Sequence, residues 1–271
     1  MALLTRDAIP TRNHIVTGFT FARYIAKKPT PRKAGGPGMT MMGNWIAFWD
    51  SKHAIYVNGR HLDVHYRRIA DDVLRYVPSR TATVLDYGCG EALHADRIAS
   101  AAGHLILVDA APSVRESLLA RFKDRPNIEI RSPQDLSALP DRSVDLVLMH
   151  SVAQYLKPPQ LSALLVLFRR LLKPGGLLIL GDVLRPNVTA LTDVLALLWF
   201  GATNGFFFAA LSGLTRTLLS DYRRLRSTLG LARYSQAEME ARLDAAGFSA
   251  TRARRNIGHH WARMTFLARP V

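Results

Sequence analysis

The sequence of 271 residues contains one cysteine, Cys89, and this scarcity excludes two ways of stabilising a fold. A single thiol cannot form a disulfide framework, and it cannot supply a cysteine zinc cluster. Cys89 stands between two glycines, where a small and weakly polar side chain fits. We therefore interpret it as a space-filling thiol in a reducing cytoplasm. Hydrophobic residues make up 48% of the chain, which is ample for a large buried core.

Acidic residues are also scarce, with 21 Asp and Glu against 36 Lys and Arg, so the formal net charge is +15. Such a charge suits an acidic partner, either anionic lipid or nucleic acid, but it does not indicate a fold. Part of the excess lies in residues 1–38, where Asp7 is the only acidic residue. This stretch lacks the apolar core of a secretory signal. We expect residues 1–42 to form a basic, disordered tail.

No metal signature is present. His61 and His65 have the i, i+4 spacing of two ligands on a helix, but the glutamate of an H-E-x-x-H motif is missing. We therefore expect no metal site.

The most informative stretch that is present reads VLDYGCGEA, from Val84 to Ala92. Apolar residues predict a buried strand, and Asp86 and the turn Gly88-Cys89-Gly90 follow at its end. Since glycine carries no Cβ, the backbone of such a turn can approach a bound nucleotide closely.

Short apolar runs alternate with helical stretches along the rest of the chain. This order predicts an α/β fold, a doubly wound sheet with helices on both faces and ligands at the carboxyl ends of its strands. A helix is expected over Trp45–Val77. The predicted strands are TVLDYG, HLILVDA, NIEIRS, SVDLVLMHS and, after the Pro174-Gly175-Gly176 break, LLILGDV, with a final pair in SATRARRNI and ARMTFLARP.

Three acids, Asp86, Asp109 and Asp135, fall at or just beyond the ends of the first three predicted strands. Each alone could be a helix cap or a solvent-exposed loop residue. Asp109, however, follows the glycine turn by about 20 residues, the position from which a carboxylate accepts hydrogen bonds from ribose hydroxyls. The turn lacks the third glycine of G-x-G-x-x-G, and Asp86 would repel a pyrophosphate but attract a sulfonium or ammonium group.

In these motifs the chain resembles the class I S-adenosylmethionine-dependent methyltransferases, over roughly residues 60–271. The matching pieces, in family order, are LDYGCGEA, LVDAAPS, SPQDLSALPDRSVDLVLMHSVAQYL and LLKPGGLLILGDV. The resemblance implies a Rossmann-like, seven-stranded sheet that is mostly parallel with an antiparallel last strand. It also implies a methyltransferase domain over residues 43–271 that binds S-adenosyl-L-methionine.

Carried over position by position, the resemblance implies a set of cofactor-binding residues. Many family members have a third glycine where this chain has Ala92, but a methyl group is tolerable there. The set comprises Asp86, Gly88, Cys89 and Gly90 for the methionine part, Asp109 and Ala110 for the ribose, Asp135 and the Leu136 backbone for the adenine, and Met149 and His150 beside the reactive methyl.

Methyl transfer needs a general base only if the acceptor is a hydroxyl or a protonated amine, and histidine is the natural candidate. His150 ends the fourth predicted strand, where it faces the site or is hydrogen-bonded within the fold. His259 and His260 follow Gly258 in the predicted turn between the last two strands. They lie either near the acceptor or on an exposed turn.

The resemblance also implies that the amino-terminal helix, with Tyr56, Arg60, His61 and His65, closes over the cofactor. Plain surface residues on an amphipathic helix are the alternative.

An unusual insertion spans about residues 183–234. Val194–Leu214 contains no charged residue and is long enough to cross a membrane, but the chain must return to complete the same sheet. Asn204-Gly205 predicts a turn between two helices. The second helix is amphipathic, with Arg216, Arg223, Arg224 and Arg226 on its polar side. We expect the insertion to form a lid that covers an apolar substrate. The alternatives are contact with a membrane, a dimer contact and a helical pair that only covers the sheet.

The sequence thus predicts an enzyme that methylates a small, lipophilic molecule at oxygen, nitrogen or carbon. An RNA or protein methyltransferase and a non-catalytic S-adenosylmethionine-binding module are the alternatives. The chain lacks the Asn/Asp-Pro-Pro-aromatic motif of nucleic-acid amino methyltransferases and shows no RNA-binding domain, so we do not expect a nucleic-acid partner. We expect a cytoplasmic location, with peripheral contact to an anionic membrane as a hypothesis and the oligomeric state left open.

Overall fold

The predicted sheet is present in the computed structural model, which describes residues 45–47, 49, 50, 56–218 and 230–271, without the side chains of residues 215–218. The predicted tail, residues 1–42, lies outside the described residues. Contacts within the chain place every described residue in one unit, Thr40–Val271.

Seven strands form a single sheet in the order β3-β2-β1-β4-β5-β7-β6. The first five run parallel, and β7 lies antiparallel between β5 and β6. The strand order reverses between β1 and β4. This arrangement confirms the predicted fold class. The strands are β1 (Thr83–Tyr87), β2 (His104–Val108), β3 (Ile128–Arg131), β4 (Val144–His150), β5 (Leu172–Val183), β6 (Phe248–Arg252) and β7 (Met264–Pro270).

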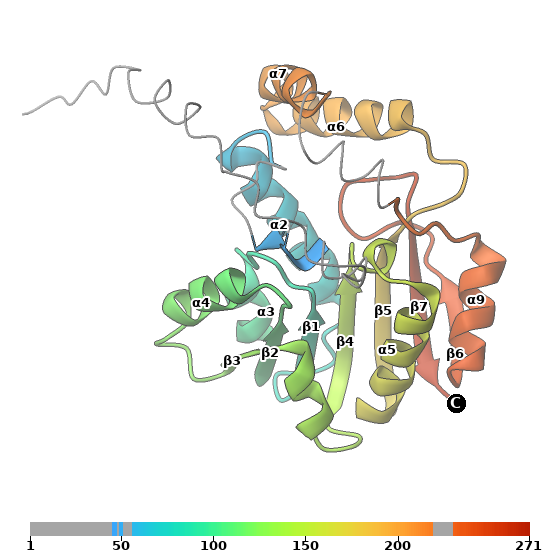
Figure 1. Cartoon of the computed structure of the whole chain (residues 1–271). Helices are drawn as coiled ribbons and strands as arrows, with labels where there is room; N and C mark the ends of the chain where they lie inside the picture. Colours follow the sequence, from blue (N-terminus) through green and yellow to red (C-terminus); the bar gives the residue numbers. More distant parts are fainter. Residues whose placement is uncertain (1–44, 48, 51–55, 219–229) are drawn as a thin grey trace, which may run out of the picture. The chain divides into compact units, whose positions relative to one another are not determined.

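Helices cover both faces of the sheet because neighbouring strand residues point to opposite faces. In β1, Val84 packs into the core beneath α2 (Gly59–Val73), α3 (Ala95–Ala101) and α4 (Pro112–Arg121). The next residue, Leu85, packs into the opposite core with α5 (Pro158–Leu171) and α9 (Gln236–Ala245). Figure 1 shows α5 and α9 together on one side of the strands. Short 3₁₀ helices, η1 (Leu74–Tyr76), η2 (Pro133–Ala138) and η3 (Ala153–Tyr155), connect the larger elements.

Two predicted boundaries were wrong. The expected helix over Trp45–Val77 is interrupted, because α2 begins only at Gly59, where Asn58 Oδ1 accepts a hydrogen bond from the His61 N–H at 2.8 Å. The fifth strand begins at Leu172, before the Pro174-Gly175-Gly176 break. Leu172 pairs with Val144 of β4. The register then shifts, so that Pro174-Gly175-Gly176 is accommodated as an irregularity, and pairing resumes between Leu177 and Leu146.

The predicted turn in the insertion is present. Gly205, at φ 75°, ends α6 (Ala190–Asn204) in the left-handed conformation, and α7 (Phe207–Leu218) follows. The two helices pack on each other, as Figure 1 shows, and α6 also contacts α2. Phe206 stacks on His61 with ring centroids 4.9 Å apart. None of the helices in the described ranges has the length and apolar character needed to cross a membrane. The structure does not describe the predicted polar side of the second helix, which comprises the side chain of Arg216 and the residues Arg223, Arg224 and Arg226.

The loop between β6 and β7 is held by Asn256. The Asn256 Oδ1 accepts hydrogen bonds from the Asp182 N–H at 3.1 Å and from the Thr265 hydroxyl at 2.8 Å. Its Nδ2 donates to the carbonyl oxygen of His260 at 3.1 Å and to Asp182 Oδ1 at 3.3 Å. This one side chain therefore connects the loop to β5 and β7.

We predict that Asn256→Ala lowers the free energy of unfolding by about 2–3 kcal/mol, because it leaves partly buried backbone groups without partners. Arg255→Ala, at the exposed neighbouring position, is the matched control and should change stability by less than about 0.5 kcal/mol. Urea unfolding followed by circular dichroism measures both. Equal stability of the two variants would contradict the anchoring role of Asn256.

Candidate functional site

A cavity opens at the carboxyl ends of β1 and β4, at the point where the strand order reverses. This is the position at which open α/β sheets bind their ligands. Its walls come from β1 and the turn after it, the end of β2, the end of β4, α2 and the segment near residues 45–49. The predicted residues in the lining are Asp86, Gly88, Cys89, Gly90, Asp109, Ala110 and His150.

The glycine turn needs its glycines for conformation and for space. Gly88 and Gly90 lie at φ 74° and 56°, in the left-handed region. A Cβ on Gly88 would lie 2.3 Å from Val152 Cγ2, which is too close for carbon atoms. The Gly88 and Cys89 N–H groups both donate to the carbonyl oxygen of Val108, at 2.7 and 3.1 Å, so the turn is fixed to the end of β2.

Ala92, at φ 42°, shares the left-handed conformation although it carries a Cβ. The resemblance puts a glycine at this position in many family members. The methyl group of Ala92 is buried in the core on this side of the sheet. The fold therefore has room for this methyl group. The backbone conformation at Ala92 is nevertheless one that alanine adopts less readily than glycine.

Asp109 fastens the turn from the side. Its Oδ2 accepts a hydrogen bond from the Gly90 N–H at 3.0 Å, and its Oδ1 accepts one from the Ala111 N–H at 2.9 Å. Arg115 donates to the Asp109 and Ala110 carbonyl oxygens at 2.8 and 2.9 Å, which fixes the backbone around the carboxylate. Burial nevertheless raises the pKa of Asp109, against the effect of these N–H groups.

Asp86 is different, because no hydrogen bond to its carboxylate is found in the described part of the chain. Burial, and secondarily the nearby charge of Asp109, raise the pKa of Asp86 to about 7. A positive group that approaches this carboxylate would favour its ionised form. Asp86 and the glycine turn could therefore hold the cationic end of a ligand whose neighbouring atoms lie against the backbone.

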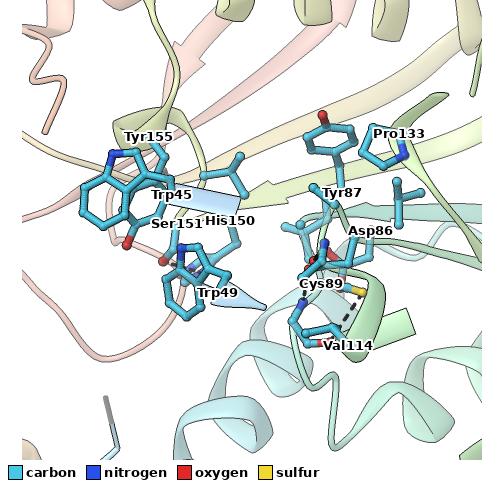
Figure 2. A pocket seen from close by; sticks show the side chains of 18 of the residues that line it. Trp45, Trp49, Asp86, Tyr87, Cys89, Val114, Pro133, His150, Ser151 and Tyr155 are labelled. Atoms are coloured by element: carbon cyan, nitrogen blue, oxygen red, sulfur yellow. Dashed lines mark hydrogen bonds between the residues drawn. The ribbon is translucent and has the colours of Figure 1, made fainter. Parts of the chain in front are cut away.

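The opposite side of the cavity is aromatic. Trp45 lies 4.6 Å from Tyr155 between ring centroids, and Trp49 lies 5.8 Å from the same ring. Figure 2 shows these three rings together near His150 and Ser151, away from Asp86 and Cys89. One cavity thus joins a carboxylate-bearing backbone turn to an apolar compartment.

His150 is hydrogen-bonded on both ring nitrogens. Its Nε2 lies 3.2 Å from the carbonyl oxygen of Ile257 and therefore carries the proton in this contact. Its Nδ1 lies 3.0 Å from Ser151 Oγ, and Asp182 Oδ2 lies 2.8 Å from the same oxygen, so Nδ1 and Asp182 compete for the one proton of this hydroxyl. Ser151 and Asp182 lie at φ 58° and 60°, a conformation that is costly outside glycine and that clusters at functional sites.

His259 and His260 do not line this cavity, and neither is fully exposed. His259 stacks on Phe200 of α6 with centroids 4.1 Å apart, and burial lowers the pKa of His259 to about 3. His260 Nε2 lies 3.0 Å from Asp193 Oδ1, which also accepts a hydrogen bond from Arg263 at 2.8 Å. The interpretation as an exposed turn was therefore wrong for both side chains. They join the loop to α6.

The remaining predicted residues lie outside the cavity lining. Asp135 is exposed and forms a capping box with Ser132, whose N–H and hydroxyl donate to its Oδ2 at 2.8 and 2.7 Å. These hydrogen bonds lower the pKa of Asp135. Leu136 and Met149 are fully buried in the core on the α5 side of the sheet. Among the residues near Asp135, Pro133 does line the cavity.

Sequence reasoning did not single out Tyr66 of α2. Tyr66 lines the cavity together with His65 and Tyr56. The hydroxyl of Tyr66 accepts a hydrogen bond from the Glu91 N–H at 2.9 Å, so α2 is tied to the glycine turn. His65 Nδ1 is buried and finds no hydrogen-bond partner among the described residues, and burial, with three neighbouring histidines, lowers the pKa of His65.

The insertion does not reach this cavity directly, since no described residue of α6 or α7 lines it. Phe200 contacts His259, and His259 lies 5.6 Å from His65, which does line it. In the described ranges, no three His, Cys, Asp or Glu side chains come together as a metal site would require.

The sequence model of the methyltransferase domain family matches residues 84–176, from β1 to the start of β5. A carboxy-S-adenosyl-L-methionine synthase from Dichelobacter nodosus (strain VCS1703A) is 27% identical over 170 residues, covering 61% of this chain and 67% of that protein. An uncharacterized 37.1 kDa protein in transposon TN4556 of Streptomyces fradiae is 30% identical over 122 residues. That match covers 43% of this chain and about a third, 34%, of the relative.

Solved structures show the same fold. Magnesium protoporphyrin IX methyltransferase from Synechocystis PCC 6803, crystallised with bound S-adenosylmethionine, superimposes with a TM-score of 0.57. The superposition covers 88% of this chain and 100% of that one at 14% identity.

We predict that Asp86→Asn stabilises the ligand-free protein at neutral and alkaline pH. The folded pKa of about 7 lies above the ordinary 3.8, so ionisation of Asp86 disfavours the folded state. Stability is lost as the pH rises between these values, at about 1.4 kcal/mol per pH unit, and asparagine removes this loss. The gain in melting temperature should therefore grow from pH 5 to pH 7 and level off above.

Asp135→Asn is the matched control. The pKa of the exposed Asp135 is lowered, so the carboxylate supports the fold when ionised and its removal should give no gain at high pH. Thermal unfolding of both variants across pH 5–8 measures the contrast. A flat difference between Asp86→Asn and the wild type would show that Asp86 is not an uncompensated buried acid.

Proposed function

We propose that this chain, whose residues 84–176 match the methyltransferase domain family and whose fold is that of an S-adenosylmethionine-bound methyltransferase, methylates a small, lipophilic acceptor. The observation that carries the proposal is the two-sided cavity, in which the turn beside Asp86 faces an aromatic compartment. Whether oxygen, nitrogen or carbon receives the methyl depends on the acceptor.

The cofactor residues belong to this proposal. Asp86 would attract the ammonium and sulfonium charges of S-adenosylmethionine, and Gly88, Cys89 and Gly90 would lie against its methionine part. Two features support the fit: the Asp86 carboxylate lacks a partner within the described chain, and a Cβ on Gly88 would meet Val152. Asp109 and Ala110 would then contact the ribose.

The adenine would lie beyond Pro133, which lines the cavity. Asp135 and the Leu136 backbone follow it in η2. We propose that they bind the adenine edge. The carboxylate of Asp135 would have to leave its hydrogen bonds to Ser132 or share them. On the sulfur side, Met149 belongs to the buried end of β4 and would support the wall that His150 forms.

Bound S-adenosylmethionine supplies an electrophilic methyl group, and the chain's main task is to align the acceptor with it. Trp45, Trp49 and Tyr155 line the cavity with aromatic surface, which favours an apolar acceptor. They also exclude water from the reacting atoms.

If the acceptor carries a hydroxyl, we propose that His150 accepts its proton through Ser151. The Ser151 hydroxyl would first turn its proton from Asp182 Oδ2 to His150 Nδ1. The serine proton would then move to Nδ1 while the acceptor proton passes to Ser151 Oγ. Asp182, 2.8 Å from Ser151 Oγ, would stabilise the resulting imidazolium. His259 and His260 are engaged in packing and ion pairing, so they are second candidates that would act through movement of the loop.

We propose that the insertion, residues 183–234, acts as a lid through α2. Phe200 and Phe206 press on His259 and His61, and these histidines adjoin His65 at the cavity. The proposed location is cytoplasmic and peripheral to the membrane, where a lipophilic acceptor would be found.

The test incubates the protein with methyl-labelled S-adenosylmethionine and a cell extract, partitions the product between organic solvent and water, and quantifies S-adenosylhomocysteine. We expect equal amounts of organic label and S-adenosylhomocysteine. Label in RNA or protein would contradict the small acceptor. Consumption of the cofactor without S-adenosylhomocysteine would indicate cofactor modification, and binding without turnover would indicate a non-catalytic module.

We predict that Asp109→Ala weakens S-adenosylmethionine binding at least tenfold, because it removes both the ribose contact and the fastening of Gly90. Asp124→Ala, at an exposed position after α4, is the control. Isothermal titration calorimetry measures both, and unchanged affinity in Asp109→Ala would overturn the ribose assignment.

For a hydroxyl acceptor, His150→Gln should lower the rate of S-adenosylhomocysteine release about 100-fold and leave cofactor affinity near the wild-type value. His104→Gln, on β2 away from the cavity lining, should leave both unchanged. Wild-type turnover by His150→Gln would remove His150 from the catalytic group.

A further inference from the structure

The outer side of α6 and α7 presents apolar side chains to solvent. Trp199 is 65% exposed and Phe208 is 83% exposed, and the other members of this apolar edge are Leu191, Leu195 and Leu211. On α6, residues 191, 195 and 199 follow one another at four-residue spacing and so share one side of the helix. The only charged residue in 190–214, Asp193, is engaged with His260 and Arg263. The edge is therefore free of charge.

A basic groove adjoins this edge between α2, α3 and α6. Arg67, Arg68 and Arg97 line it, with His94 at its α3 end. Trp199 belongs both to the groove and to the apolar edge, so the two surfaces are continuous. Figure 1 shows α6 and α7 lying beyond the end of the sheet, near α2.

The lining of the groove contains more guanidinium groups than carboxylates, and it also contains His94, whose Nε2 lies 2.9 Å from Asp63 Oδ1. Arg97 lies 2.7 Å from Asp71, the one carboxylate in the lining, and Arg68 lies 3.7 Å from Asp72. Arg67 forms no ion pair with any described residue. Three guanidinium groups thus face one lining carboxylate, and guanidinium groups bind phosphate oxygens in paired hydrogen bonds.

We propose that this groove binds the phosphate of an anionic phospholipid while the apolar edge enters the headgroup region of the bilayer. The inference specifies the site of the peripheral membrane contact included in the proposed function. Tryptophan favours the membrane–water interface, and Trp199 stands at the boundary between arginines and apolar side chains. A nucleic acid would find phosphate ligands in the groove but would lie against uncharged aliphatic side chains beyond it, so we favour the membrane.

The test is flotation with vesicles of phosphatidylcholine alone and of phosphatidylcholine with 30% phosphatidylglycerol, at physiological salt and without cofactor. Wild-type protein should bind the anionic vesicles only. Arg67→Gln with Arg68→Gln should bind them roughly 30-fold more weakly, because each arginine at an anionic surface contributes about fivefold. Trp199→Ala should also weaken binding, and wild-type tryptophan fluorescence should shift to the blue on binding but much less in Trp199→Phe.

The matched control is Lys123→Gln with Arg125→Gln, which removes the same charge from exposed positions after α4. If the control lost as much vesicle binding as the Arg67/Arg68 variant, net charge would account for the effect, and the assignment of the groove would be overturned. Equal binding to neutral vesicles would overturn the assignment of an anionic phospholipid to the groove. Loss of RNA-homopolymer binding in the Arg67/Arg68 variant, with vesicle binding unchanged, would assign the groove to nucleic acid instead.

Two further measurements separate this proposal from the catalytic one. Cofactor affinity of the Arg67/Arg68 variant, measured by calorimetry, should equal that of the wild type, because neither side chain lines the cavity at β1 and β4. Formation of S-adenosylhomocysteine from the cofactor, with detergent-extracted acceptors as substrates, should also persist. A variant can therefore lose vesicle binding and keep methyl transfer, or lose methyl transfer and keep vesicle binding, so the two proposals are tested separately.

Discussion

The contact on which the site depends is the carboxylate of Asp109 on the N–H groups of Gly90 and Ala111. It joins the ends of two neighbouring strands, β1 and β2, and holds the turn in the left-handed conformation that its glycines permit. Because the turn is fixed by a buried acid, a second acid at Asp86 is left facing the cavity. Burial, and after it the proximity of Asp109, raises the pKa of Asp86, and a positively charged ligand would offset this effect.

A second layer of contacts surrounds the cavity without lining it. The loop between β6 and β7 makes three of these contacts. The carbonyl oxygen of Ile257 accepts a hydrogen bond from His150, and the Gly258 N–H donates one to Asp72 of α2. His259 stacks on Phe200 of α6. The histidines in this layer pack as rings against other rings, and burial lowers the pKa of His61 to about 4 and of His259 to about 3. They therefore act as neutral packing groups near pH 7, and movement of α6 would be transmitted through them toward His65.

The aromatic side of the cavity and the apolar edge of α6 and α7 differ in their surroundings. Trp45, Trp49 and Tyr155 line the cavity and make that side of it less polar. Trp199 and Phe208 face solvent and need a partner to bury them. A lipophilic acceptor delivered from a membrane would meet the second surface before it reached the first.

The sequence by itself determined the α/β class, the seven strands and the place of Asp86, Gly88 and Asp109 at their ends. Alternating periodicity and glycine turns are local properties, and parallel strands bring their carboxyl ends to one edge wherever such a sheet forms. Only the tertiary structure decided the surroundings of each side chain. It engaged Asp135 as a cap, buried Met149 away from the cavity and turned His65 and Tyr66 of α2 toward it. These outcomes depend on how α2 and the β6–β7 loop pack over the sheet, and contacts between residues far apart in the chain leave no periodic signal.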